Sequence, residues 1–271
     1  MDKAADKIRI MGIANLTGDS FFEGSRLLGG DDALDPAFFL SRVDSMVSEG
    51  ADILDLGACS TRPGSDSVSE EVEWGRLEPA LRLLMSERPG LNLSIDTFRP
   101  GIVSKAFDII GPFIVNDVSG GSDAMWKTVG KLGLEYVCMH SRGTPKNMQT
   151  LTSYDDVVAD VLAFFKSFSE AAEKHGIREW ILDPGFGFAK TVEQNWLILK
   201  ELSRFKELGR PILAGLSRKS FLYKPLGITP AESLPATCAA NLTALQGGAD
   251  ILRVHDVEAA KQTVEVFYRS F

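Results

Sequence analysis

Eight short apolar runs, each followed by a turn and a segment with a helix-like pattern, constrain the fold of this 271-residue chain more than any other feature. The runs are nearly continuous in apolar residues rather than alternating, which is typical of parallel strands that helices cover on both faces. They lie at 8–15, 51–57, 91–97, 113–119, 135–140, 179–185, 211–217 and 249–256. No linker or low-complexity stretch interrupts the pattern, so we expect one domain over residues 1–271.

Amphipathic segments separate these runs, the clearest at 38–50, 154–176 and 192–209. The last two end at Gly176 and Gly209, and a glycine after the final apolar residue is a helix stop signal. Eight strands alternating with about eight helices predict an α/β fold, a (β/α)8 barrel with its active site at the C-terminal ends of the strands. A doubly wound open sheet is the alternative.

Composition narrows the functions that such a barrel could have. The formal net charge is −8, which argues against non-specific binding to nucleic acid or to an anionic membrane. No run approaches the ~20 apolar residues of a membrane span, and the N-terminal stretch lacks the apolar region of a signal peptide. The three cysteines, Cys59, Cys138 and Cys238, lie far apart, as free thiols in a reducing compartment do. We therefore expect a cytoplasmic protein with no nucleic acid or membrane partner.

Polar or ionisable residues stand at the C-terminal end of every apolar run. A single residue of this kind has a simple structural explanation, because Asp and Asn often cap the following helix or form a turn. Eight such ends together indicate a polar pocket, since the active sites of barrels form from the C-terminal ends of several strands. In chain order the residues are Asn15, Cys59 to Arg62, Asp96, Asn116 with Asp117, His140, Asp183, Ser217 to Ser220, and Arg253 with His255.

These residues fall into two chemical groups. Asp96, Asn116 and Asp183 offer acceptors and one amide, which can pair with the donor-rich edge of a flat heterocycle carrying an amino group and a ring N–H. The second group is cationic or polar and suits a phosphate or carboxylate. It contains Asn15, Arg62, Lys219, Arg253 and His255. The pattern predicts a pocket with a polar heterocycle at its floor and an anion at its mouth.

The motifs around these residues carry a family resemblance that covers nearly the whole chain in the family's own order. The chain resembles the dihydropteroate synthase family, transferases of folate biosynthesis that join 6-hydroxymethyl-7,8-dihydropterin pyrophosphate to p-aminobenzoate and release pyrophosphate. The matching stretches are MGIANLTGDSFFEGSR (11–26), GADILDLGACSTRPG (50–64), LSIDTF (93–98), VNDVSGG (115–121), MHSRGTPKNMQ (139–149), LDPGFGFAKTVEQN (182–195), GLSRKSFL (215–222) and RVHD (253–256).

The resemblance implies roles for individual residues. Those implied to contact the pterin are Asp96, Asn116, Asp183, Phe188, Lys219 and Arg253, of which the catalytic ones are Asp96, Asp183, Lys219 and Arg253. Those implied to bind pyrophosphate are Asn15, Arg62, Arg253 and His255, with Mg²⁺ held by Asn15. Those implied to contact p-aminobenzoate are Thr61, Pro63 and Ser220, and a mobile loop over the site contains Asp19, Ser20 and Phe21.

The resemblance also implies a dissociative mechanism, because the amine of p-aminobenzoate is a weak nucleophile. Pyrophosphate would leave before the amine attacks, and Asp96 and Asp183 would stabilise the pterin cation that remains. The family commonly dimerises through its last helices, so we expect a homodimer. The apolar residues available there are Val264, Val266, Phe267, Tyr268 and Phe271.

Three residues near the pocket are expected to have structural roles. Cys59 stands where many family members have glutamate and is read as a small buried thiol. His140 is expected to be structural rather than catalytic. The pair Arg218-Lys219 is expected to divide, with Lys219 turned into the pocket and Arg218 pointing away to a structural partner.

Two other functions stay open from the sequence. A pterin-binding methyltransferase of the same superfamily would share Asp96, Asn116 and Asp183, but it would not need the cationic group described above. A non-catalytic pterin-binding protein would not be expected to keep the complete catalytic set that is present here.

Overall fold

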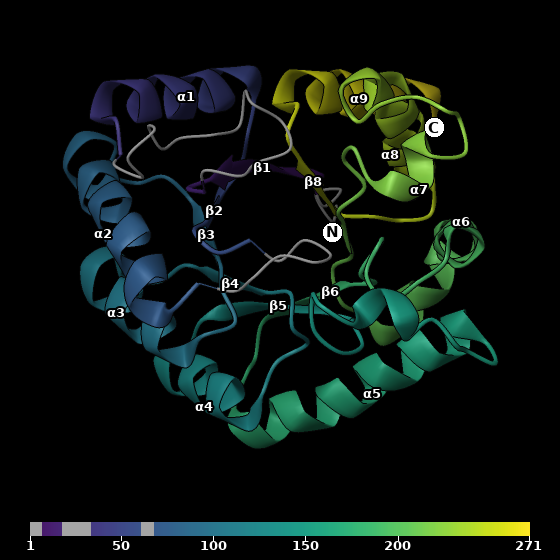
Figure 1. Ribbon diagram of the computed structural model, residues 1–271, viewed down its shortest axis with the longest axis horizontal. Helices are drawn as coiled ribbons and strands as arrows, with labels where there is room; N and C mark the ends of the chain where they lie inside the picture. Colours follow the sequence, from purple (N-terminus) through teal and green to yellow (C-terminus); the bar gives the residue numbers. More distant parts are fainter. Residues whose placement is uncertain (1–6, 18–33, 61–67) are drawn as a thin grey trace, which may run out of the picture.

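The computed structural model describes residues 7–17, 34–60 and 68–271, and they form a ring of parallel strands surrounded by helices (Figure 1). The strands are β1 (Arg9–Asn15), β2 (Ile53–Gly57), β3 (Leu93–Asp96), β4 (Ile114–Asp117), β5 (Glu135–Met139), β6 (Trp180–Asp183), β7 (Leu213–Ala214) and β8 (Ile251–Val254). Each strand begins within one of the apolar runs of the sequence, as the pattern predicted.

The helices follow the strands in alternation. They are α1 (Pro36–Glu49), α2 (Glu70–Glu87), α3 (Pro100–Ile110), α4 (Asp123–Leu132), α5 (Val157–His175), α6 (Val192–Lys200), α7 (Ser220–Tyr223), α8 (Leu234–Gln246) and α9 (Val257–Ser270). Short 3-10 segments lie at η2 (Met148–Thr150), η3 (Leu202–Leu208) and η4 (Ala231–Ser233). Within the described residues, no helix is both long and apolar enough to cross a membrane.

Local signals explain where several helices begin and end. The side chains of Asp156 and Thr191 accept hydrogen bonds from backbone N–H groups in the first turns of α5 and α6. Gly176 adopts a left-handed conformation with φ of 74° and ends α5 as predicted. The segment 192–209 differs from the prediction of one helix. It divides into α6 and the 3-10 segment η3, and Gly209 ends the second part.

The sheet closes into a barrel. The hydrogen-bonded order of the strands is β6-β5-β4-β3-β2-β1-β8-β7. The two ends of this order meet through a parallel bridge between Leu182 and Ile212, with Leu182 N donating to Pro211 O at 3.0 Å. The predicted (β/α)8 barrel is therefore confirmed, and the alternative of an open sheet is wrong.

Two layers of side chains fill the inside of the barrel. The lower one, named here the apolar layer, is a buried cluster of Met11, Ile53, Ile114, Val137, Ile181, Leu213 and Ile251. Alternate residues of a strand point to the same face, so residues further along also face inward, nearer the C-terminal ends. This upper set is named the polar layer and comprises Asp55, Asp96, Asn116, Asp183 and Arg253.

Candidate active site

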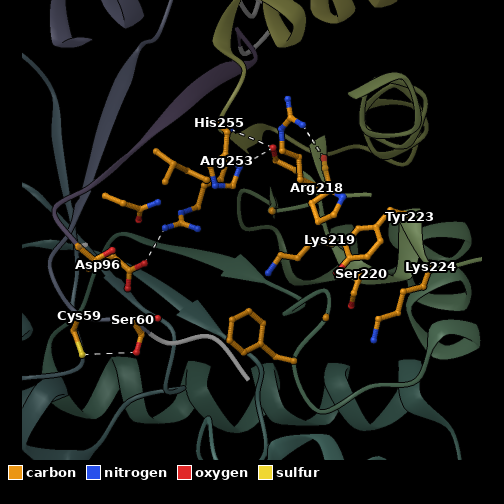
Figure 2. Close-up of a pocket in the computed structure, with 18 of the residues that line it drawn as sticks. Cys59, Ser60, Asp96, Arg218, Lys219, Ser220, Tyr223, Lys224, Arg253 and His255 are labelled. Carbon is orange, nitrogen blue, oxygen red and sulfur yellow. Dashed lines mark hydrogen bonds and ion pairs between the residues drawn. The ribbon is translucent and has the colours of Figure 1, made fainter. Parts of the chain in front are cut away.

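A cavity of about 420 Å³ opens at the C-terminal ends of the strands (Figure 2). Its lining includes the predicted anion-site residues Asn15, Ser220 and His255, together with Ser217, Tyr223 and Lys224. A smaller recess adjoins this outer cavity on the side of the polar layer. All six residues predicted to contact a pterin line the recess: Asp96, Asn116, Asp183, Phe188, Lys219 and Arg253. The two predicted groups of residues thus surround two neighbouring compartments, which share Asp96, Phe188, Lys219 and Arg253 in their linings.

Arg253 is fixed at the floor between two carboxylates. Its Nε donates to Asp55 Oδ2 at 2.7 Å and its Nη2 donates to Asp96 Oδ2 at 2.8 Å. Asp55 is fully buried and also accepts from Ser94 Oγ at 2.6 Å and from Asn116 Nδ2 at 3.1 Å. Two carboxylates share one guanidinium, and this arrangement holds the side chains of β2, β3 and β8 in fixed positions.

Sequence reasoning missed Asp55 and Ser94. Both lie inside apolar runs rather than at their ends, so a search of strand ends passes over them. Asp55 had one available signal, because it follows Ile53 by two residues and therefore shares its inward face. An acid at an inward position of an otherwise apolar strand needs a partner, and here the partner is Arg253.

The carboxyl of Asp96 is strongly perturbed by its place in the floor. Burial raises its pKa to about 7, with the neighbouring charge of Asp55 adding to the shift and Arg253 opposing it. Its Oδ1 is buried and has no hydrogen-bond partner among the described residues. A ligand that offers an N–H group to the recess would satisfy this oxygen.

Asp183 reaches the recess from the end of β6. Its Oδ1 accepts from Gly185 N at 2.8 Å, which fixes the carboxyl plane. Burial raises its pKa, while the hydrogen bond from Gly185 and the charge of Lys219 act in the opposite direction. Asp183 therefore adds a second oriented acceptor to the floor.

Lys219 stands where the recess and the outer cavity meet. Its Nζ lies 4.4 Å from the centre of the Phe188 ring, within the range of a cation–π contact. Burial lowers its pKa to about 8, against the opposing charge of Asp183. Lys219 is thus largely an ammonium at neutral pH, at the border between the recess and the outer cavity.

His255 differs from the prediction in its charge. Burial, with Arg253 nearby, lowers its pKa to about 3, so the ring is neutral at neutral pH. The backbone N–H of His255 donates to Ser217 Oγ at 3.3 Å, and that hydroxyl lies 2.9 Å from Nδ1. A hydroxyl donates one hydrogen bond and can accept two, so this contact fits either neutral tautomer of the ring. His255 thus presents a neutral ring rather than a cation to the outer cavity.

The predicted division of Arg218 and Lys219 is confirmed. Figure 2 shows Lys219 directed into the cavity and the guanidinium of Arg218 directed away from it. Arg218 donates to both carboxylate oxygens of Asp256, at 2.9 and 2.8 Å, and to the backbone oxygens of Pro230 and Ala231. The helix that follows, α7, is a single turn of 4 residues, so its dipole adds little to Ser220 as an anion site.

Other strand-end residues do not join the site. Asp117 turns away and accepts from Tyr136 OH at 2.9 Å and from Ser119 Oγ at 2.6 Å. His140 is buried and contacts Lys190 instead of the cavity. Cys59 lines the outer cavity, but burial raises the pKa of its thiol, which supports its interpretation as an unreactive side chain.

Several predicted residues lie outside the part of the chain that the structure describes. They are Asp19, Ser20 and Phe21 of the first loop and Thr61, Arg62 and Pro63 of the second. Their predicted roles therefore stay predictions.

The described residues contain no cluster of three or more His, Cys, Asp or Glu side chains that could hold a metal ion. Asn15 ends β1 and lines the outer cavity, where its amide oxygen is a hard ligand. Mg²⁺ commonly takes one or two protein oxygens and completes its coordination with substrate phosphates and water. The site thus fits a Mg²⁺ ion that arrives with a diphosphate, rather than a metal caged by the protein alone.

Comparison with known proteins agrees with this geometry. The family model described as "Pterin binding enzyme" matches residues 11–255. The dihydropteroate synthase of Synechocystis sp. is 40% identical over 262 residues, which cover 95% of this chain and 88% of that protein. The chain therefore belongs to the class of pterin-binding enzymes.

Two solved structures make the assignment more specific. Dihydropteroate synthase from Thermus thermophilus in complex with 4-aminobenzoate gives a TM-score of 0.86 at 37% identity, covering 98% of this chain and 95% of that one. The same enzyme in complex with 6HMPPP gives a TM-score of 0.82 at 35% identity, with the same coverage. The chain belongs to the dihydropteroate synthase family of transferases.

Proposed function

We propose that the protein condenses 6-hydroxymethyl-7,8-dihydropterin pyrophosphate with p-aminobenzoate to give 7,8-dihydropteroate and pyrophosphate. The observation that carries the proposal is the division of the site. Heterocycle-binding groups line the recess, anion-binding groups line the outer cavity, and Asp96, Phe188, Lys219 and Arg253 line both where the two meet. A flat pterin with a charged diphosphate tail has the same two-part chemistry. This observation also favours a synthase over the methyltransferase and the non-catalytic binding protein.

The recess would hold the pterin by its polar edge. Asp96 Oδ1 and the carboxyl of Asp183 would accept hydrogen bonds from the amino and ring N–H groups. Because Asn116 Nδ2 donates to Asp55, its Oδ1 would be left as a further acceptor. The phenyl ring of Phe188, whose face contacts Lys219 Nζ, would pack against the pterin ring.

Pyrophosphate would depart before the new bond forms. The C–O bond of the pterin methylene would break, and its electron pair would leave with the diphosphate. Lys219, the ring of His255 and Arg62 would stabilise the departing charge, while Asp96 and Asp183 would stabilise the cation on the pterin. The arylamine would then attack the methylene carbon and lose a proton.

p-Aminobenzoate would enter through the outer cavity. Ser220 lies there one turn from Tyr223 and would donate a hydrogen bond from its hydroxyl to the carboxylate. Thr61 and Pro63 are proposed as further contacts of p-aminobenzoate. Mg²⁺, held by Asn15 and the diphosphate, would neutralise part of the charge of the leaving group. Asp19, Ser20 and Phe21 are proposed to cover the site as a mobile loop.

We further propose a single-domain, cytoplasmic homodimer that associates through its last helices. α8 and α9 lie side by side on the barrel surface (Figure 1). Val266, Tyr268 and Phe271 are exposed there and support this surface as an interface. Val264 and Phe267 were also predicted for it, but Val264 is buried and Phe267 packs against the core.

A pyrophosphate-release assay with both substrates and Mg²⁺ tests the proposed function. We expect release that needs both substrates and that EDTA suppresses. Lys219→Ala should lower kcat/KM about 100-fold or more, because an ammonium at the developing charge is lost. Lys200→Ala, on the exposed face of α6, is the matched control and should leave the rate unchanged. A folded wild-type protein that releases no pyrophosphate would overturn the proposal.

A further inference from the structure

Lys190 is a buried cation that the reaction described above does not use. It follows β6 by seven residues, and its side chain is only 4% exposed. Its Nζ lies 3.0 Å from His140 Nδ1, 3.0 Å from Gly185 O and 3.1 Å from Phe188 O. These contacts join the end of β5 to both halves of the loop after β6.

These three nearest acceptors match the three hydrogens of an ammonium group, and His140 O lies further away, at 3.4 Å from Nζ. Burial, together with the charge of Lys190, lowers the pKa of His140 to about 2, so its ring is neutral and Nδ1 can accept. Burial lowers the pKa of Lys190 to about 7, while the charge of Asp183 opposes that shift and Lys219 and Arg142 add to it. A neutral amine would have one hydrogen fewer and would lose one of these buried hydrogen bonds, which the geometry disfavours.

The loop closed around Nζ carries two pterin-site groups. Phe188 gives its backbone oxygen to Lys190 and its ring face to Lys219. Gly185 gives its backbone oxygen to Lys190 and its N–H to Asp183. Gly185 has φ of 72°, and an added Cβ would come within 1.9 Å of His140 O, so only a glycine fits this close approach of the loop to the end of β5.

Resting on the proposed function, we infer that Lys190 is a positioning residue for pterin binding: its ammonium holds the loop 184–190 so that Phe188 and Asp183 face the recess. It lines neither the recess nor the outer cavity, so its effect passes through those two residues. Loss of the cation therefore weakens recognition of the pterin and leaves recognition of p-aminobenzoate unaffected.

Lys190→Met tests this inference, because it keeps the length of the side chain and removes its donors. The KM for dihydropterin pyrophosphate should rise about tenfold or more, as expected when charge-assisted hydrogen bonds that order a site are lost. The KM for p-aminobenzoate at saturating pterin should stay within about twofold of wild type. Lys127→Met, on the exposed face of α4, is the matched control. A folded variant with an unchanged pterin KM, or with both KM values raised equally, would overturn the inference.

A double-mutant cycle with Phe188→Ala separates positioning from general damage to the fold. If Lys190 acts through Phe188, the double variant should lose less pterin-binding free energy than the sum of the two single losses. A double loss equal to that sum would contradict the inference. Lys190→Gln keeps an N–H donor and replaces the methionine variant if that variant does not fold. It should also raise the KM for dihydropterin pyrophosphate and not the KM for p-aminobenzoate, but by a smaller factor. Calorimetric binding of 6-hydroxymethylpterin provides the readout independently of turnover. Absence of wild-type turnover would therefore overturn the proposed function while the role of Lys190 is still tested.

Discussion

The apolar layer and the polar layer of the barrel interior are neighbours on the same strands, yet they have opposite chemistry. Ile53, Ile114, Ile181 and Ile251 belong to the apolar layer. Two residues further along, the same strands carry Asp55, Asn116, Asp183 and Arg253. One two-residue step thus separates side chains whose burial stabilises the barrel from side chains whose burial is unfavourable without partners.

The difference shows how the barrel positions its site. The apolar layer packs the strands against one another and excludes water from below. The polar layer rests on it, with Asp55 fully buried between Ser94, Asn116 and Arg253. Since each polar group is held by strand backbone on one side and by a neighbour's hydrogen bond on the other, it is oriented before substrate arrives.

The largest effect is expected from removing Arg253. In Arg253→Ala, Asp55 and Asp96 lose their shared cation and stay buried. The free energy of unfolding should fall by about 3–5 kcal/mol, as when one partner of a buried ion pair is deleted. Urea denaturation measures this loss, and Arg269→Ala on the exposed end of α9 is the control. A loss no larger than the control's would show that the polar layer does not depend on its central charge.

A smaller effect is expected from pH, through Asp96. Its pKa is raised from 3.8 to about 7, so the carboxylate that would accept from the pterin forms as pH rises through neutrality. Pterin affinity should therefore increase about tenfold between pH 6 and pH 8 and level off above, since the ionised fraction follows the pKa. Calorimetric titration across this range measures it, and Asp96→Asn should remove the dependence. Affinity that falls with rising pH would contradict the role of this carboxylate.

The smallest effect is expected in the apolar layer. Ile181→Val removes one methylene group from a fully buried side chain two residues before Asp183. The free energy of unfolding should fall by about 1 kcal/mol, and kcat/KM should change by less than about twofold. Thermal or urea unfolding and the pyrophosphate assay measure the two quantities. A large loss of activity here would remove the distinction between the layers.

The sequence predicted the barrel and most of the recess, because both follow from the same periodicity. Near-continuous apolar runs gave the strands, and their C-terminal ends gave Asp96, Asn116, Asp183 and Arg253. These predictions hold because strand direction and the two-residue repeat are local properties that a sequence displays directly.

Other features depended on three-dimensional surroundings and could not be read in advance. The neutral state of His255 follows from burial beside Arg253, which no local pattern records. Asp55 lies within an apolar run and Lys190 within a loop. Each has a partner that is far away in the sequence, Arg253 for Asp55 and His140 for Lys190. Val264 was predicted for a surface, but its position on α9 turns it into the core.

The central claim is that the polar layer is the pterin site, and Asp183→Asn tests it most directly. The variant keeps an oxygen for Gly185 N and loses only the negative charge and one acceptor. Calorimetric titration with 6-hydroxymethylpterin, which lacks the diphosphate, should show affinity reduced about tenfold or more, because a charge-assisted hydrogen bond is lost. The free energy of unfolding of the variant should stay close to that of the wild type. Unchanged affinity for this ligand in the folded variant would contradict the account.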